Sequence, residues 1–285
     1  MRVDIIPPFG FCFGVKKAIE DAIKIKKENP NKRIFIYGDL VHNKHVMDYL
    51  VSENIFNIKA SGDFSFDTRD LNVNDILIFS AHGHKLDYEK DLEKRNITFY
   101  STTCKNVQKN LDLIKNNLNR GVIYIGKNNH PESVAALSIS SEIIFFDIEK
   151  GTMDKKCKYS SPIIINQTTL SILELNDIYS IIKRSIPRSV LSDEICSATR
   201  IRQEAIINLS EDYDLVLVVG SKKSSNTTKL YSIIKRNKPK IDCFYIENLE
   251  DCSLIDKKNY NNVAIVGGTS TPQECLFKVR DFLEH

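Results

Sequence analysis

The chain has 285 residues, of which 42% are hydrophobic and 27% are charged, and its formal net charge is +3. This composition is typical of a globular protein with enough apolar residues to form a core. The weak positive charge does not support nucleic-acid binding, which requires a basic face and a recognition motif. No apolar run is long enough to cross a membrane. We therefore expect neither a nucleic-acid partner nor a membrane span.

Short apolar runs alternate with helical patterns along the chain. In chain order, the runs are residues 33–38, 74–81, 121–126, 142–148, 161–166, 214–220, 242–247 and 262–268. Their content of Ile, Val and Phe is typical of buried parallel strands. The helical patterns are residues 15–27, 107–118, 132–139, 173–185, 201–210, 227–236 and 272–284. This alternation predicts an α/β fold, in which ligands bind beyond the carboxyl ends of the strands.

Three cysteines recur at equal spacing: Cys104 follows Cys12 by 92 residues, and Cys196 follows Cys104 by 92 residues. Two polar strand ends follow each cysteine at similar distances. The first set is His42, His130 and Ser224, and the second is His82, Thr168 and Ser270. We therefore predict three similar α/β lobes in a pseudo-threefold (trefoil) arrangement around a central cavity. The expected boundaries are 13–102, 103–194 and 195–285, with residues 1–12 joining the third lobe.

The cysteines suit a metal site built from distant parts of the chain. The seven cysteines are an odd number and include no CxxC pair, so a disulfide framework is not expected. Three thiolates on a [4Fe–4S] cluster, which usually has four, would leave one iron open as a Lewis acid. Each cysteine alone would more often be a buried structural thiol. The regular spacing favours ligation.

Polar residues after two strands are suited to an anionic ligand. Ser224, Ser225 and Asn226 follow a strand and a glycine turn, and Ser270 lies in GGTSTP. Hydroxyl, amide and backbone N–H groups at a helix start bind anions, although they can equally be helix caps. The candidate donors that follow other apolar runs are His42, His82 and His130. Strand-end or surface histidines are the alternative for these three.

One acidic residue lies within these strand-end motifs. Glu132, in NNHPES, is the best candidate proton donor, although a carboxylate there can also complement the helix dipole. Gln167, Thr168 and Thr169, in NQTTL, can orient a water or a substrate hydroxyl or cap a helix.

Nine segments in order resemble the motifs of the LytB/IspH family of 4-hydroxy-3-methylbut-2-enyl diphosphate reductases. They are GFCFGVKKAIE, VHNKHV, SAHGH, STTC, NHPE, NQTTL, EICSATRIRQEA, VVGSKKSSN and GGTSTP, and they span nearly the whole chain. The resemblance implies the last step of the methylerythritol phosphate route to isoprenoids. In that step an oxidoreductase removes the allylic hydroxyl of its diphosphate substrate and yields isopentenyl and dimethylallyl diphosphate.

The resemblance also implies roles for individual residues. It implies one [4Fe–4S] cluster bound by Cys12, Cys104 and Cys196, and catalysis by Glu132 with Thr168. Together, the resemblance and the motifs described above imply that the substrate is bound by His42, His82, His130, Gln167, Thr168, Ser224, Ser225, Asn226 and Ser270. The resemblance implies ferredoxin or flavodoxin as the electron donor. We expect a soluble protein of a bacterial-type cytoplasm or a plastid-type stroma.

Some positions depart from the family pattern. His84 follows SAHG, Asn128 and Asn129 precede HPE, and Ser197 and Ile201 occupy less usual places in the third cysteine motif. None of these removes a cysteine or the acid. Three alternatives remain at this point: a three-lobed cluster enzyme of the quinolinate synthase type, an iron or redox sensor, and a metal-free phosphate-binding protein.

Overall fold

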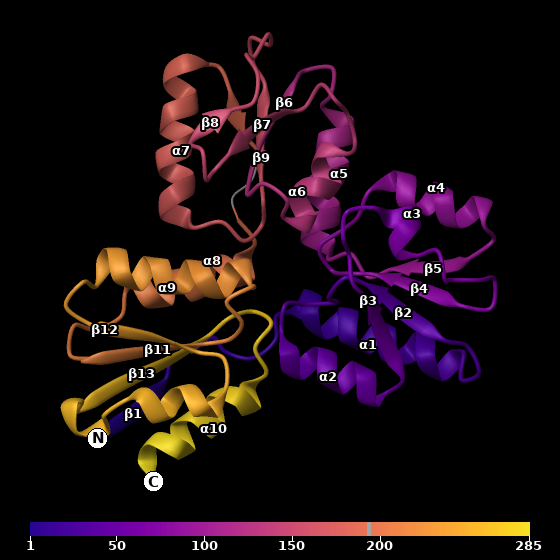
Figure 1. The fold of residues 1–285 in the computed structure, drawn as a ribbon. Coiled ribbons are helices and arrows are strands. Elements are labelled where there is room, and N and C mark those ends of the chain that lie inside the picture. Colours follow the sequence, from indigo (N-terminus) through magenta and orange to yellow (C-terminus); the bar gives the residue numbers. More distant parts are fainter. Residues whose placement is uncertain (193–194) are drawn as a thin grey trace.

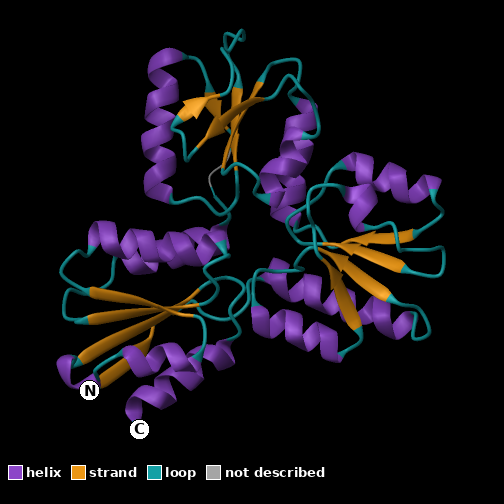
Figure 2. Ribbon diagram, in the orientation of Figure 1, coloured by secondary structure: helices purple, strands orange, loops and turns teal. Residues whose placement is uncertain are grey.

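The computed structural model describes residues 1–192 and 195–285, and within them the chain has an α/β fold with three separate sheets. The predicted α/β class is confirmed, and nearly all strand pairs are parallel. Figure 2 shows the three sheets in three lobes around a common centre, each with helices against its strands.

The first lobe contains a parallel sheet with the strand order β3-β2-β4-β5. Its strands are β2 (Ile34–Tyr37), β3 (Ile55–Ile58), β4 (Ile76–Phe79) and β5 (Thr98–Ser101). Its helices are α1 (Phe13–Glu28), α2 (Lys44–Ser52), α3 (Phe64–Asp67) and α4 (Leu86–Lys94).

The second lobe contains a sheet with the strand order β10-β9-β6-β7-β8, in which only the β7–β8 pair is antiparallel among the described residues. Its strands are β6 (Val122–Gly126), β7 (Ile144–Asp147), β8 (Thr152–Met153), β9 (Ile163–Asn166) and β10 (Val190–Leu191). Its helices are α5 (Lys105–Asn116), α6 (Pro131–Leu137) and α7 (Ile172–Ser185).

The third lobe combines both ends of the chain, as Figure 1 shows. Its parallel sheet has the order β1-β13-β11-β12, so the first strand pairs with the last. The strands are β1 (Arg2–Ile5), β11 (Leu215–Val219), β12 (Asp242–Ile246) and β13 (Asn262–Gly267). The helices are α8 (Ser197–Ile207), α9 (Ser225–Asn237), α10 (Gln273–Glu284) and the short 3₁₀ helices η1 (Leu249–Leu254) and η2 (Lys257–Asn259).

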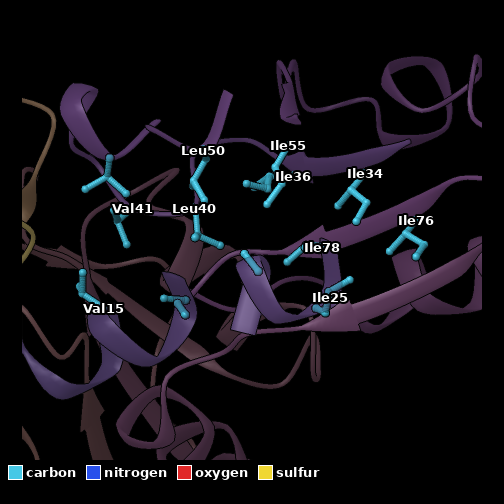
Figure 3. Packing of buried hydrophobic residues seen from close by; sticks show 14 residues of the cluster. Val15, Ile25, Ile34, Ile36, Leu40, Val41, Leu50, Ile55, Ile76 and Ile78 are labelled. Carbon is cyan, nitrogen blue, oxygen red and sulfur yellow. The ribbon is translucent and has the colours of Figure 1, made fainter. Parts of the chain in front are cut away.

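The strands at the middle of each sheet are buried on both faces. Every residue of β4, β6, β9 and β11 is buried. Helices cover both sides of a parallel sheet, which explains why these strands are continuous apolar runs in the sequence. Figure 3 shows one such core, where Val15 and Ile25 of α1 share a cluster with Ile36 and Ile78 of the sheet.

Elements with weaker apolar patterns were not predicted from the sequence. The strands that were not predicted are β1, β3, β5, β8 and β10, and each lies at the edge of its sheet. Edge strands bury less surface: β3 and β5 each expose two of their four residues. The helices that were not predicted are α2, α3 and α4 of the first lobe. No helix among the described residues has the length and apolar character needed to cross a membrane.

Replacing Ile78 with Ala tests the packing of the first lobe. Ile78 is fully buried in β4, so the cavity left by the change should lower the free energy of unfolding by about 2–5 kcal/mol. Val73, which is 55% exposed just before the same strand, is the matched control. Val73→Ala should change stability by at most about 0.5 kcal/mol. Equal effects in urea denaturation would contradict the assignment of Ile78 to the core.

Candidate active site

Residues from all three lobes line one central cavity of about 90 Å³. The strand-end residues predicted from the sequence meet here because the carboxyl ends of the parallel strands face the centre. The predicted residues on its wall are Cys12, His42, His82, Cys104, His130, Glu132, Thr168, Cys196, Ser224, Ser225, Asn226 and Ser270. Gln167 is not part of the wall.

Each of the three cysteines is the N-cap residue of a helix, namely α1, α5 or α8. The cysteine N–H groups make equivalent backbone hydrogen bonds. They donate to the carbonyl oxygens of loops that follow central strands: Cys12 to Thr269 at 3.0 Å, Cys104 to Ala81 at 3.0 Å, and Cys196 to Thr168 at 3.1 Å. One repeated contact thus places all three thiols at the cavity.

The local electrostatics of the thiols are set by burial and by helix N-termini. None of the three helices has an acidic residue in its first turn, so the positive end of each helix dipole is uncompensated beside its cysteine. Burial raises the pKa of Cys12 and Cys104, and backbone N–H groups of the first turn partly oppose this. The charges of the other cysteines also raise these pKa values, so the three thiols lie near one another.

Gly14, which has no side chain, lets the Cys104 thiol pack directly against the backbone of α1. A Cβ atom at this position would lie 2.6 Å from Sγ of Cys104 and 4.0 Å from Sγ of Cys12. Any side chain would therefore displace the Cys104 thiol. Within residues 1–192 and 195–285, no three His, Cys, Asp or Glu side chains converge tightly enough to hold a single metal ion.

The Ser224–Asn226 segment begins helix α9 at the cavity. Ser224 is the N-cap residue, and its Oγ accepts from the N–H of Thr227 at 3.5 Å. The side chain of Asn226 is buried, yet neither its Nδ2 nor its Oδ1 has a hydrogen-bond partner. Buried amides are normally paired, so this side chain is prepared for a polar ligand. Ser270 is buried and also lines the cavity, after strand β13, which pairs with β11.

Three histidines form a continuous group on another part of the wall. The rings of His42 and His82 stack at 4.6 Å, and those of His82 and His130 meet edge to face at 5.9 Å. Burial lowers the pKa of His130 to about 3, and burial also lowers the pKa of His82 far below its ordinary value. Nδ1 of His130 accepts from the N–H of Glu132 at 3.2 Å, which leaves Nε2–H as a donor.

Glu132 is buried at the start of helix α6, with 2% of its surface exposed. Its two carboxylate oxygens accept from the N–H and the Oγ1–H of Thr168, each at 2.9 Å. Burial raises the pKa of Glu132 to about 7, although the bonds from Thr168 act in the opposite direction. A carboxyl group with this pKa exchanges its proton near neutral pH, as a general acid must.

Two residues that support Glu132 were not predicted. Asn110 of α5 hydrogen-bonds to the carboxyl group, and its Nδ2 also donates to the carbonyl of Asn166 at 2.9 Å. Tyr124 of β6 is fully buried nearby, and burial and the charge of Glu132 raise its pKa. The sequence does contain a signal for Asn110, because this polar residue interrupts the buried face of α5 between Val107 and Ile114.

Gln167 lies behind the wall and connects two lobes. Its Oε1 accepts from the N–H of Lys127 at 3.0 Å. Its Nε2 donates to Oγ1 of Thr169 at 2.9 Å and to Oγ of Ser225 at 3.3 Å. Thr169, the third candidate of the NQTTL motif, does line the cavity.

The departures from the family pattern have local explanations in two cases. The ring of His84 stacks on Phe79 at 3.6 Å, and its Nε2 pairs with Glu89 at 2.8 Å, so it belongs to the first lobe and not to the cavity wall. Ser197 and Ile201 are exposed on α8 and also lie off the wall.

Comparison with known proteins identifies close relatives over the full length. A family model described as LytB protein matches residues 3–284. The 4-hydroxy-3-methylbut-2-enyl diphosphate reductase of Clostridium perfringens is 35% identical over 281 residues, which cover 95% of this chain and 96% of that protein. The reductase of the same name from Bacillus subtilis is 33% identical and covers 100% and 91%.

The fold is also similar to a solved structure. The E-1-hydroxy-2-methyl-but-2-enyl-4-diphosphate reductase from Plasmodium falciparum superposes with a TM-score of 0.86 and 26% sequence identity. The match covers 100% of this chain and 88% of that chain.

The raised pKa of Glu132 predicts a specific pH dependence of stability. Between about pH 4.5 and pH 7 the folded protein holds a proton on Glu132 that the unfolded chain has released. The free energy of unfolding should therefore fall as pH rises through this window, by about 3 kcal/mol relative to Glu132→Gln. Urea denaturation of both proteins across this range measures the difference. Parallel pH profiles would show that the carboxyl group ionises at its ordinary pKa.

Proposed function

The chain belongs to the LytB family, and from this membership we propose that it converts 4-hydroxy-3-methylbut-2-enyl diphosphate into isopentenyl and dimethylallyl diphosphate. It is an oxidoreductase, because its relatives over the full length are 4-hydroxy-3-methylbut-2-enyl diphosphate reductases. The family is an iron–sulfur family of the methylerythritol phosphate pathway.

One observation supports this proposal most strongly. A single small cavity brings three thiols, the unpaired amide of Asn226 and a buried acid with a pKa of about 7 together. The three functions that the reaction needs are cofactor ligation, anion binding and proton donation, and residues suited to each line the same cavity. A sensor or a metal-free phosphate-binding protein would have no use for Glu132.

The cofactor in this proposal is one [4Fe–4S] cluster on Cys12, Cys104 and Cys196. A cluster is wider than a single ion, so its thiolates surround it without converging on one point. The three uncompensated helix N-termini support this fit, because they provide a positive field for an anionic group. When bound, the cluster supplies electrons and one iron without a protein ligand.

The diphosphate in this proposal binds between α9 and the histidines. Asn226 and the hydroxyl groups of Ser224, Ser225 and Ser270 provide neutral donors, and Nε2–H of His130 provides another. Gln167 contributes by fixing Ser225. As neutral rings, His82 and His130 each keep an N–H group as a donor, and the charge of a bound diphosphate would raise the pKa values of these two histidines. These contacts hold the substrate by its diphosphate group, which is distant from the reacting carbon, and so orient that carbon in the cavity.

Glu132 delivers the proton in this proposal. Thr168 binds both carboxylate oxygens, so the carboxyl group has one orientation toward the cavity. With a pKa of about 7, it is partly protonated at neutral pH and can release that proton to the departing hydroxyl group.

We also infer that the three lobes, at 13–102, 103–194 and 195–285 with 1–12, are related by a pseudo-threefold axis. The equivalent hydrogen bonds of the three cysteine N–H groups support this relation.

As electron donor we propose a protein of the ferredoxin or flavodoxin type. The exposed, basic Lys105 directly after Cys104 supports an acidic donor.

Turnover of 4-hydroxy-3-methylbut-2-enyl diphosphate with an artificial one-electron donor under anaerobic conditions tests the function. The reconstituted protein should release both products. Glu132→Gln should keep its iron content and lose about a hundredfold or more in kcat, because the amide cannot supply the proton. Undiminished turnover by Glu132→Gln would assign the acid elsewhere. A reconstituted protein that holds iron and gives no product would contradict the function.

The anion site predicts a change in KM. Asn226→Ala removes two unpaired polar atoms from the cavity and should raise KM by about tenfold or more, with a smaller effect on kcat, because the contact is made equally in the ground and transition states. Asn119→Ala, at an exposed turn outside the cavity, is the control and should leave KM unchanged. An unchanged KM in Asn226→Ala would place the diphosphate elsewhere.

A further inference from the structure

Arg202 is a buried cation close to the cysteine motifs. It lies on helix α8, whose N-cap residue is Cys196, and only 5% of its surface is exposed. Its guanidinium group makes two bonds to backbone oxygens, from Nη1 to Ala198 at 3.0 Å and from Nη2 to Gly10 at 2.7 Å. Arg202 therefore connects the turn before Cys12 to the helix of Cys196.

No carboxylate neutralises Arg202 among the described residues. Burial lowers the pKa of Arg202, and the thiolate forms of Cys12 and Cys196 act in the opposite direction. Nε is buried and has no hydrogen-bond partner. Arginine does not give up its proton in proteins, and a buried charge is normally paired. The side chain therefore holds a positive charge that is incompletely balanced when the thiols are protonated.

The proposed cofactor would supply the missing negative charge. A cluster held by three thiolates is anionic, and it becomes more negative when it accepts an electron. A nearby fixed cation stabilises the reduced form more than the oxidised form and so raises the reduction potential. The bond to Gly10 holds the guanidinium group in place as the charge changes.

We propose that Arg202 is the buried counter-charge of the iron–sulfur cluster, and that it sets the ease with which the cluster accepts electrons. This inference rests on the proposed function, because it requires a cluster at the three cysteines. Arg202 is a positioning and electrostatic residue in this proposal and does not touch the substrate. The competing explanation is a purely structural link between Gly10 and α8.

The reduction potential separates the two explanations. An anaerobic redox titration followed by electron paramagnetic resonance compares the loaded wild type with Arg202→Gln and Arg202→Lys. At a fixed applied potential, the ratio of reduced to oxidised cluster should fall about tenfold in Arg202→Gln, which corresponds to about 59 mV for one electron. Arg202→Lys keeps the charge and should stay within about threefold of the wild type.

Arg236→Gln is the matched control for the loss of one positive charge. Arg236 is exposed on α9 and pairs with Asp177 at the surface, so its removal should leave the potential unchanged. A potential in Arg202→Gln equal to that of the wild type would overturn the proposal. Equal shifts in Arg202→Gln and Arg202→Lys would also overturn it, because the lost geometry and not the charge would then be responsible.

The stability of the cluster-free protein provides a second readout. The gain in melting temperature on cluster loading should be smaller for Arg202→Gln than for the wild type, and an equal gain would contradict the role. Arg202→Met replaces Arg202→Gln if the latter does not fold. If neither neutral variant folds without the cluster, the proposal is overturned, because Arg202 would then be required for folding itself. If the wild-type protein bound no iron, the result would instead contradict the proposed function itself.

Discussion

The hydrogen bond from each cysteine N–H to a loop carbonyl is the contact on which the site depends. It joins the first residue of a helix to a loop that follows a central strand, and it occurs once for each cysteine. The same residue therefore fixes the thiol and the start of the next lobe. The cavity therefore forms only when all three lobes are in place, because each cysteine is positioned by a hydrogen bond to a loop of the preceding lobe.

The sequence predicts the interior of this fold better than its edges. The central strands β4, β6, β9 and β11 are buried on both faces and so appear as uninterrupted apolar runs. Strands β3 and β5 lie at sheet edges and expose polar or aromatic residues to solvent, which weakens their pattern. A strand of this kind is specified mainly by the neighbour with which it pairs, and a local pattern cannot contain that information.

The candidate site shows the same division. Residues at strand ends could be predicted from spacing and motif, and the structure places all but Gln167 on the wall of one cavity. Their chemical roles stay predictions. Asn110, Tyr124 and Arg202 act from behind the wall, where a residue has its effect only through contacts between segments distant in the chain. The motif around Gln167 indicated the region correctly, but only the tertiary structure shows that its amide connects two loops.

The pairing of β1 with β13 has a consequence for the order of assembly. Arg2 lies opposite Asn262, and the N–H of Cys12 bonds to Thr269, so the first thiol is fixed by the last strand unit of the chain. During synthesis, the first and second lobes can form while the third is still absent. Cys12 is the earliest of the three cysteines to be made and the last to reach its final position. The fold thus delays completion of the thiol site until β13 and Thr269 have been made.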